Sequence, residues 1–170
     1  NNLTETAINF SLVGKVENHS VVMSDAPMFH IIGLITVVRP VILQGATFVV
    51  SDGFEPARTL GRLADPELKV SHYFCVPVMA DLIKAEPDYS PEKLKSLTAI
   101  FTGGAPYAEA KIQDWVKDGI PVANGFGMSE AGTVFGMPVD IDLIAARPGS
   151  TGITTSRVKA RIVDSGGEPC

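Results

Sequence analysis

The chain has 170 residues, 45% of them hydrophobic, and a mean hydropathy of +0.21, which is enough apolar material for one sizeable core. Its formal net charge is -5, its pI is about 5.1, and its Lys and Arg residues form no run. This balance excludes the basic surface that nucleic acid or an anionic membrane needs, so neither is an expected partner.

The first predicted elements are a helix over residues 3–16, with Thr4 at its cap, and a series of strands. Five short apolar runs predict the strands, at residues 21–25, 46–51, 71–76, 98–102 and 121–124. Their starts lie 23 to 27 residues apart, which fits one strand, one helix and two short loops per unit. Since each run is apolar and does not alternate with polar residues, we expect an α/β fold, a parallel sheet with helices on both faces.

The segments between the strands have helical patterns. Residues 31–43 are apolar nearly all round, which predicts a buried helix that Arg39 and Pro40 bend or interrupt. Shorter helices are predicted over residues 56–64 and 78–85.

A further helix is predicted over residues 107–117, where apolar side chains recur at i, i+4, i+7 and i+8 on one face. Pro106 is placed to open this helix, and Gly119 is placed to end it.

The pattern changes near Arg147. Residues 157–163 alternate between two faces and predict a strand of an antiparallel segment, and residues 164–167 are a strong turn signal. We therefore expect an α/β subdomain over residues 1–146, and a loop with a truncated β hairpin of the next subdomain over residues 147–170. The unpaired hairpin strand would expose an edge that favours self-association.

The two cysteines indicate a reducing environment. Cys75 lies in an apolar run and Cys170 is the last residue, so they do not resemble a disulfide framework. No apolar run is long enough to span a bilayer, so no transmembrane segment is predicted. The expected location is intracellular, either cytoplasmic or peroxisomal.

Unusual loops follow three of the predicted strands, at residues 25–30, 102–106 and 124–130. In a parallel sheet these loops share one edge. Their glycines let a ligand approach the backbone, and a helix that starts there offers free N–H groups. Ser129 and Glu130 add a hydroxyl and a carboxylate, and a carboxylate beside phosphates commonly binds Mg²⁺.

Taken singly, these residues have common structural explanations. A Gly-Gly-Ala-Pro loop is more often a tight turn than a ligand site, and His30 is more often a hydrogen-bonded histidine near a core. Glu130 fits a helix-start carboxylate, and Phe126 and Met128 fit a core. Their common position on one sheet edge is what favours a functional site.

Four segments resemble motifs of the adenylate-forming superfamily, which includes acyl-CoA synthetases and peptide-synthetase adenylation domains. Residues 27–34 resemble its histidine-bearing segment, and residues 102–106 its adenine-side glycine loop. Residues 124–130 resemble its aromatic-Gly-x-Thr-Glu motif, and residues 147–152 its Lys/Arg-Pro-Gly-x-x-Gly loop. The resemblance covers most of the chain in the family's order and spacing.

The resemblance implies a role for each matching position. The residues implied to form the adenine and phosphate side are Gly103, Gly104, Ala105, Pro106, Asn124, Gly125, Phe126, Gly127, Met128 and Ser129. Those implied to lie near the acid are Phe29, His30, Asn124, Gly125, Met128 and Gly132. Phe126 would stack on adenine, Ser129 would contact phosphate, and Glu130 would hold Mg²⁺. His30, Ser129 and Glu130 are the implied catalytic residues.

The implied chemistry is a two-step ligation. A small carboxylic acid attacks the α-phosphorus of ATP to give an acyl-adenylate, and coenzyme A then displaces AMP. These 170 residues lack the family's Ser/Thr/Gly-rich phosphate loop with its Lys, its ribose-binding aspartate and its C-terminal domain. The resemblance therefore implies an internal fragment of the large N-terminal domain, inactive by itself.

Two alternatives stay open. The chain could belong to an adenylation domain that loads a carrier protein, although Asp25 does not match that group's amino-binding aspartate. It could also be a non-catalytic nucleotide-binding α/β fragment. The apolar surroundings of His30 and Met128 favour an aryl or medium-chain acid.

Overall fold

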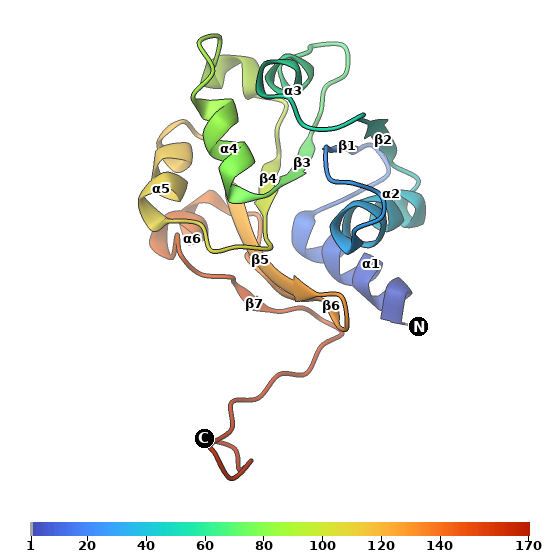
Figure 1. The fold of residues 1–170 in the computed structure, drawn as a ribbon, viewed down its shortest axis with the longest axis vertical. Helices are drawn as coiled ribbons and strands as arrows, with labels where there is room; N and C mark the ends of the chain where they lie inside the picture. The colour runs from blue at the N-terminus through green and yellow to red at the C-terminus, as the bar shows by residue number, and fades with distance from the viewer. Residues whose placement is uncertain (1) are drawn as a thin grey trace.

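A computed structural model describes residues 2–170 and confirms the expected α/β class (Figure 1). In these residues the sheet has seven strands in the order β2-β1-β3-β4-β5-β6-β7. The first five, each at a predicted position, are β1 (Val21–Ser24), β2 (Thr47–Val50), β3 (His72–Cys75), β4 (Ala99–Thr102) and β5 (Val122–Met128). All neighbouring pairs among these five are parallel. β3 and β4 are buried at every position, as expected of central strands covered on both sides.

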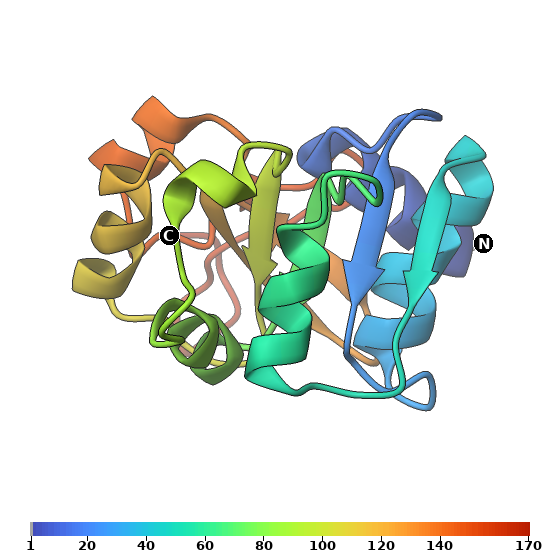
Figure 2. The ribbon, with the colours of Figure 1, turned by 90° about the horizontal axis from the view of Figure 1, so that it is seen from above.

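Helices flank the sheet on both sides. The helical segments are α1 (Asn2–Gly14), η1 (Ile32–Val38), α2 (Arg39–Gln44), α3 (Pro56–Leu63), α4 (Pro77–Lys84), η2 (Pro91–Leu94), α5 (Glu109–Lys117) and α6 (Ile141–Ala146). α1 packs against η1 and α2, whereas α3 packs against α4. Figure 2 shows α3 on the side of the sheet opposite α1 and α2. From β1 the chain runs to β2 on one side, whereas from β3 it runs to β4 on the other side. The strand order therefore reverses between β1 and β3, which is a topological switch point.

His72 of β3 joins the sheet to the end of α1. Its Nε2 lies 2.9 Å from the carbonyl oxygen of Gly14, and its Nδ1 lies 2.7 Å from Ser71 Oγ. The ring also stacks on Phe101 at an interplanar angle of 3°. Because a carbonyl only accepts hydrogen bonds, the ring proton sits on Nε2. Burial lowers the pKa of His72 below its ordinary value of 6.5.

We expect the free energy of unfolding to fall as the pH drops below about 6.5, because unfolded His72 then binds a proton more readily than the folded form. Above that pH both forms are neutral and the His72 contribution is complete. Urea midpoints between pH 7.5 and pH 5 measure the slope. In His72→Gln the chain should be less stable at every pH but should lose this part of the slope. An unchanged slope in His72→Gln would contradict the assignment.

The end of β5 corrects the sequence prediction. A loop was expected after Asn124, but β5 continues to Met128 and forms a hairpin with β6 (Gly132–Gly136). A Cβ on Gly127 would lie 2.5 Å from the carbonyl oxygen of Gly132, and one on Gly125 would lie 3.3 Å from that of Phe135. The missing Cβ atoms of these glycines therefore make room for the partner strand. The β5–β6 pair is antiparallel and lies within residues 1–146, where only a parallel sheet was expected. β7 (Ile153–Thr154) then pairs antiparallel with β6.

The segment over residues 31–43 is less buried than predicted. Ile42 is 74% exposed, and Leu34 and Leu43 are each 47% exposed. Only one side of η1 packs against α1 and β1, and only one side of α2 packs against α1. The predicted interruption at Arg39 and Pro40 is present as a change from π-helical to α-helical hydrogen bonding between η1 and α2. Proline lacks the N–H that a continuous α-helix needs, and a wider turn accommodates it.

α5 begins later than predicted. Pro106 does not open it, because the chain stays extended through Ala108, which is the N-cap. Tyr107 is buried there, and its hydroxyl donates to Asp81 at 2.9 Å and accepts from Trp115 Nε1 at 3.1 Å. The predicted end is confirmed, since Gly119 has a φ of +77° just after the helix.

The strand predicted over residues 157–163 is absent from the described structure. Val163 and Pro169 form an isolated bridge, and Ile162 is 80% exposed, because no neighbouring strand covers this segment. The turn is confirmed: the Asp164 carboxylate accepts from the backbone N–H groups of Gly166 and Glu168. Figure 1 shows this segment extending away from the sheet. The division into subdomains at residue 147 stays a prediction. No helix among residues 2–170 is long and apolar enough to cross a membrane.

Candidate functional site

The loop after β1 brings His30 to the carboxyl edge of the sheet. The backbone N–H of His30 donates to the carbonyl oxygen of Pro27 at 3.0 Å. A Cβ on Gly33 would collide with the same carbonyl, so only glycine lets η1 fold back onto this loop. The backbone N–H of Ile32 donates to His30 Nδ1 at 3.2 Å. This bond selects the tautomer with the proton on Nε2 of an exposed imidazole.

The loop after β4 brings two glycines to the same edge. Thr102 Oγ1 donates to Asn124 Oδ1 at 2.5 Å, which ties the ends of the parallel parts of β4 and β5 together. Gly104 has a φ of +83°, a conformation that favours glycine, and the nearest atom to a Cβ there would be Ile32 Cδ1 at 3.8 Å. The backbone is therefore open to a ligand on this side.

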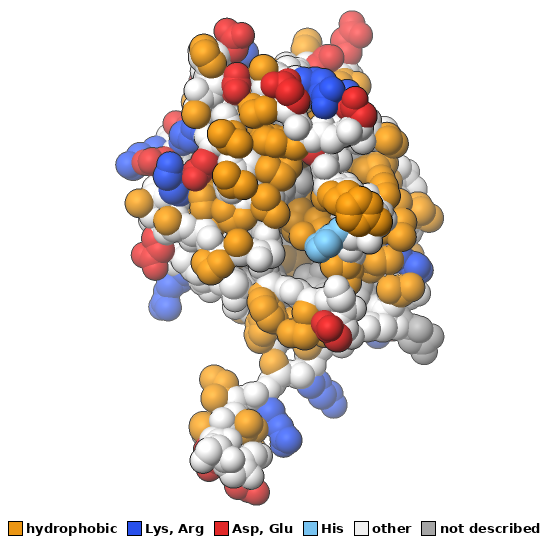
Figure 3. All heavy atoms as spheres, viewed as in Figure 1, with side chains coloured by type: hydrophobic (Ala, Val, Ile, Leu, Met, Phe, Trp, Pro, Cys, Tyr) orange, Lys and Arg blue, Asp and Glu red, His pale blue; other side chains and the backbone are white. Residues whose placement is uncertain are grey.

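A single cavity of about 240 Å³ joins these loops to β5 and β6. Figure 3 shows hydrophobic side chains gathered around a hollow on this face. The predicted site residues that line the cavity are His30, Gly103, Gly104, Asn124, Gly125, Phe126, Gly127, Met128, Ser129 and Gly132. The predicted site residues outside its lining are Phe29, Ala105, Pro106 and Glu130. Phe29 is 93% exposed and does not reach the cavity in this arrangement.

The cavity has a buried floor and an exposed rim. Phe10, Phe74 and Phe101 are buried and form the floor. Phe126 and Met128 are each 43% exposed and form part of the rim. An apolar floor with polar groups near its opening is the usual form of a small-molecule site.

Several lining residues were not predicted from the sequence. They are Phe10, Val13, Ile31, Ile32, Thr36, Phe74, Phe101, Thr102, Ala123, Thr133, Phe135, Gly136 and Met137. The i, i+3 spacing of Phe10 and Val13 indicates one face of α1, but not that this face packs over the carboxyl edge of the sheet. Phe74 is the last residue but one of β3 and Thr102 is the last of β4, so both lie near the sheet edge where the sequence predicts a site.

Glu130 lies in the turn between β5 and β6 and not at a helix start, which corrects that expectation. It is exposed, and it adjoins Ser129 on the rim. In residues 2–170 no group of three or more His, Cys, Asp or Glu side chains is placed to hold a metal ion. One carboxylate at an open rim still fits Mg²⁺, which usually keeps several waters and binds substrate phosphates.

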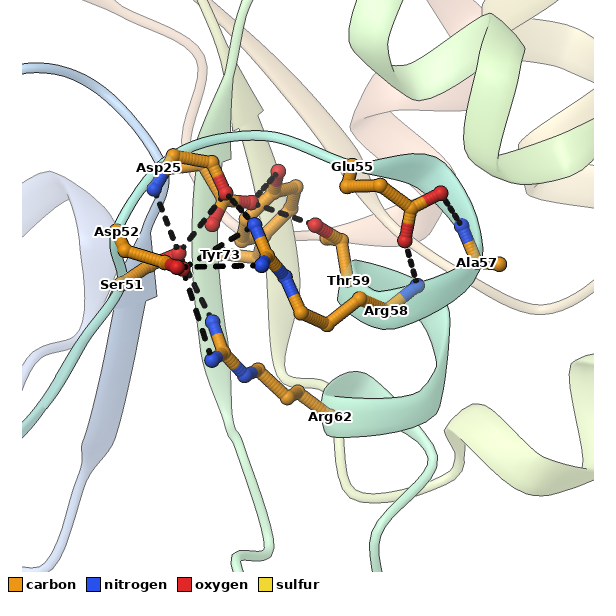
Figure 4. Close-up of polar contacts among 10 residues, drawn as sticks. Asp25, Ser51, Asp52, Glu55, Ala57, Arg58, Thr59, Arg62 and Tyr73 are labelled. Atoms are coloured by element: carbon orange, nitrogen blue, oxygen red, sulfur yellow. Dashed lines mark hydrogen bonds and ion pairs between the residues drawn. The ribbon is translucent and has the colours of Figure 1, made fainter.

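A buried network anchors the start of the His30 loop (Figure 4). Asp25 Oδ2 accepts from the hydroxyl of Tyr73 at 2.8 Å and from that of Thr59 at 2.9 Å. Burial raises the pKa of both Tyr73 and Cys75, and the nearby Asp25 charge raises each further. Tyr73 therefore stays a donor, and the Cys75 thiol stays un-ionised and unreactive. Asp25, which follows β1, thus fixes the loop to β3 and α3.

Comparison with family models matches residues 1–170 to the family described as AMP-binding enzyme. The chain belongs to this family. The resemblance inferred from the four motifs is therefore confirmed. This AMP-binding family member is 29% identical over 168 residues to a feruloyl-CoA synthase of Amycolatopsis sp, covering 99% of the chain and 34% of the relative. It is 26% identical over 140 residues to a 2-succinylbenzoate–CoA ligase of Staphylococcus aureus, covering 82% and 27%.

Solved structures share the fold. Residues of this AMP-binding family member superpose on ATP-bound MatB from Rhodopseudomonas palustris with a TM-score of 0.88 at 20% identity, covering 99% of this chain and 33% of that one. The chain thus spans about a third of the length of the proteins that it matches. The curated relatives that it matches include CoA ligases.

Proposed function

We propose that this chain forms the acid pocket and the adenine side of an ATP-dependent acid–CoA ligase. The observation that carries the proposal is the cavity in which three separate family motifs meet, one holding His30, one holding Gly103 and Gly104, and one running from Asn124 to Ser129. The CoA-ligase relatives support coenzyme A as the acceptor.

Each part of the cavity has a proposed task. The open backbone at Gly104 and the half-exposed ring of Phe126 would hold adenine between them. Ser129 would donate to phosphate, while Glu130 would hold Mg²⁺, which neutralises phosphate charge when it is bound. His30 accepts a hydrogen bond at Nδ1, so its Nε2–H would be the group that orients the acid at the rim. The buried floor would take the body of the acid and exclude water from it.

The reaction that these positions serve begins with attack of the acid's carboxylate oxygen on the α-phosphorus of ATP. The phosphoanhydride bond breaks, pyrophosphate leaves, and an acyl-adenylate forms. The thiol sulfur of coenzyme A then attacks the acyl carbon and AMP leaves. Holding the two reactants in line is worth about 7–11 kcal/mol of such a barrier. An intracellular location and self-association of the isolated chain are further proposals.

A carrier-protein adenylation domain is the second candidate, and it differs only in the acceptor. Asp25 does not favour it, because its carboxylate accepts hydrogen bonds from Thr59 and Tyr73 and lies outside the cavity lining. In the ligase, product formation should follow the concentration of coenzyme A; dependence on a carrier protein would instead support the second candidate.

We expect the isolated chain to bind AMP weakly and to form no acyl-adenylate, because no lysine lines its cavity to hold the triphosphate. Titration of the ¹⁵N-labelled chain with AMP should shift the amide resonances of Gly103, Gly104 and Phe126. Ribose 5-phosphate, which lacks the adenine, should not shift them. Acid-dependent exchange of pyrophosphate into ATP should stay at background. Exchange at the rate of an intact ligase, or the absence of any AMP response, would contradict this proposal.

A further inference from the structure

The cavity lining carries no fixed charge in the part of the chain that the structure describes. None of its residues is Asp, Glu, Lys or Arg, and His30 on the exposed rim is its one titratable side chain. Its interior polar groups are neutral, such as the hydroxyls of Thr36 and Thr102 and the amide of Asn124. A charged group carried into this interior would lose its hydration without gaining a counter-ion.

The floor is closed by three aromatic rings from three elements. Phe10 of α1 meets Phe101 of β4 edge to face, with ring centroids 5.0 Å apart at 60°. It also meets Phe74 of β3 at 6.1 Å and 49°. All three are buried, so the cavity ends at these rings.

We propose that the acid this site takes is a compact aryl monocarboxylic acid whose body carries no second charge; this rests on the proposed function. The carboxylate stays at the rim near His30, where ATP would meet it, and the aromatic ring enters the apolar interior toward Phe10, Phe74 and Phe101. A second carboxylate on the ring is excluded by the missing counter-ion. A long aliphatic acid is excluded by the closed floor.

The proposal is tested by titrating the ¹⁵N-labelled chain with three acids that differ in one property each. Cinnamate is the compact aryl acid, 4-carboxycinnamate adds a second charge at the far end, and decanoate replaces the ring by a long chain. Cinnamate should bind most tightly, on the order of 100-fold more tightly than 4-carboxycinnamate and about tenfold more tightly than decanoate. The amides of Thr36, Thr102 and Gly125 should report the binding.

A matched pair of variants on α1 tests the reason for the preference. Val13 lines the cavity, whereas Leu12 is 59% exposed and outside the lining. Val13→Lys should raise the affinity for 4-carboxycinnamate relative to cinnamate by about tenfold or more, because the ammonium supplies the missing counter-ion. Leu12→Lys adds the same charge to the same helix and should leave the ratio unchanged.

Equal affinity for cinnamate and either other acid in the unmodified chain would overturn the proposal, as would equal effects of Val13→Lys and Leu12→Lys. The titrations of the unmodified chain with the three acids test the proposal even if Val13→Lys fails to fold, which the ¹⁵N spectrum of the variant would reveal. The AMP titration of the same sample separates the two proposals. AMP binding without any response to cinnamate refutes the acid class alone, and cinnamate binding without any AMP response refutes the ligase assignment alone.

Discussion

Gly132→Ala should lower the free energy of unfolding by about 3 kcal/mol or more, enough to unfold a marginally stable chain. Gly132 has a φ of +72°, where an L side chain costs about 1 kcal/mol. Its Cβ would also collide with the side chain of Thr6, which is 2% exposed and cannot retreat into solvent. The collision falls where α1 packs on β6, so the substitution would separate the helix from the sheet and open the cavity between them.

Two other glycines separate strain from collision. Gly119 has a φ of +77° with nothing near its would-be Cβ, so Gly119→Ala should cost only about 1 kcal/mol. Gly61 lies within α3 in open space, so Gly61→Ala should stabilise the chain by about 0.5–1 kcal/mol. Urea unfolding followed by the fluorescence of buried Trp115 measures all three. Similar shifts for Gly132→Ala and Gly119→Ala would show that the contact with Thr6 is unimportant.

Glu130→Gln should lower the rate of acyl-adenylate formation on the order of 100-fold in the proposed ligase, while the free energy of unfolding changes by less than about 1 kcal/mol. The side chain is exposed in the β5–β6 turn, and among the described residues it makes no hydrogen bond or ion pair, so loss of its charge leaves the fold unaffected. Glutamine keeps the size but loses the charge that would hold Mg²⁺ beside the phosphates.

Pyrophosphate exchange at several Mg²⁺ concentrations is the measurement for Glu130→Gln. The variant should need more Mg²⁺ to approach its maximal rate, whereas the KM for the acid should change little because the carboxylate lies outside the cavity lining. Glu67→Gln, another exposed glutamate far along the chain from the rim, is the matched control and should be unaffected. A loss of folded protein with normal activity per folded molecule would assign Glu130 a structural role instead.

The local sequence by itself determined the repeating strand and helix units. The runs that became β3 and β4 are apolar without alternation, and such runs are stable only when both faces of the sheet are covered. Because all parallel strands end at one edge, the order of the motifs already implied that His30, Gly103 and Asn124 converge, and all three line the cavity. The turn at residues 164–167 was likewise predictable, since Asp164 and its glycines make it locally.

The tertiary structure decided which atoms pack against the glycines and which part of the sheet each helix covers. The sequence predicts an open ligand loop at Gly125 and Gly127, yet their missing Cβ atoms make room for β6. Glu130 therefore lies in a hairpin turn and not at a helix start. The floor depends on Phe10, whose place over the sheet comes from long-range packing of α1 and not from its neighbours in the chain. Residues 157–163 show the converse: their alternation suits a strand, but a strand needs a partner across its hydrogen-bonding edge, and only the isolated Val163–Pro169 bridge supplies one in the described structure.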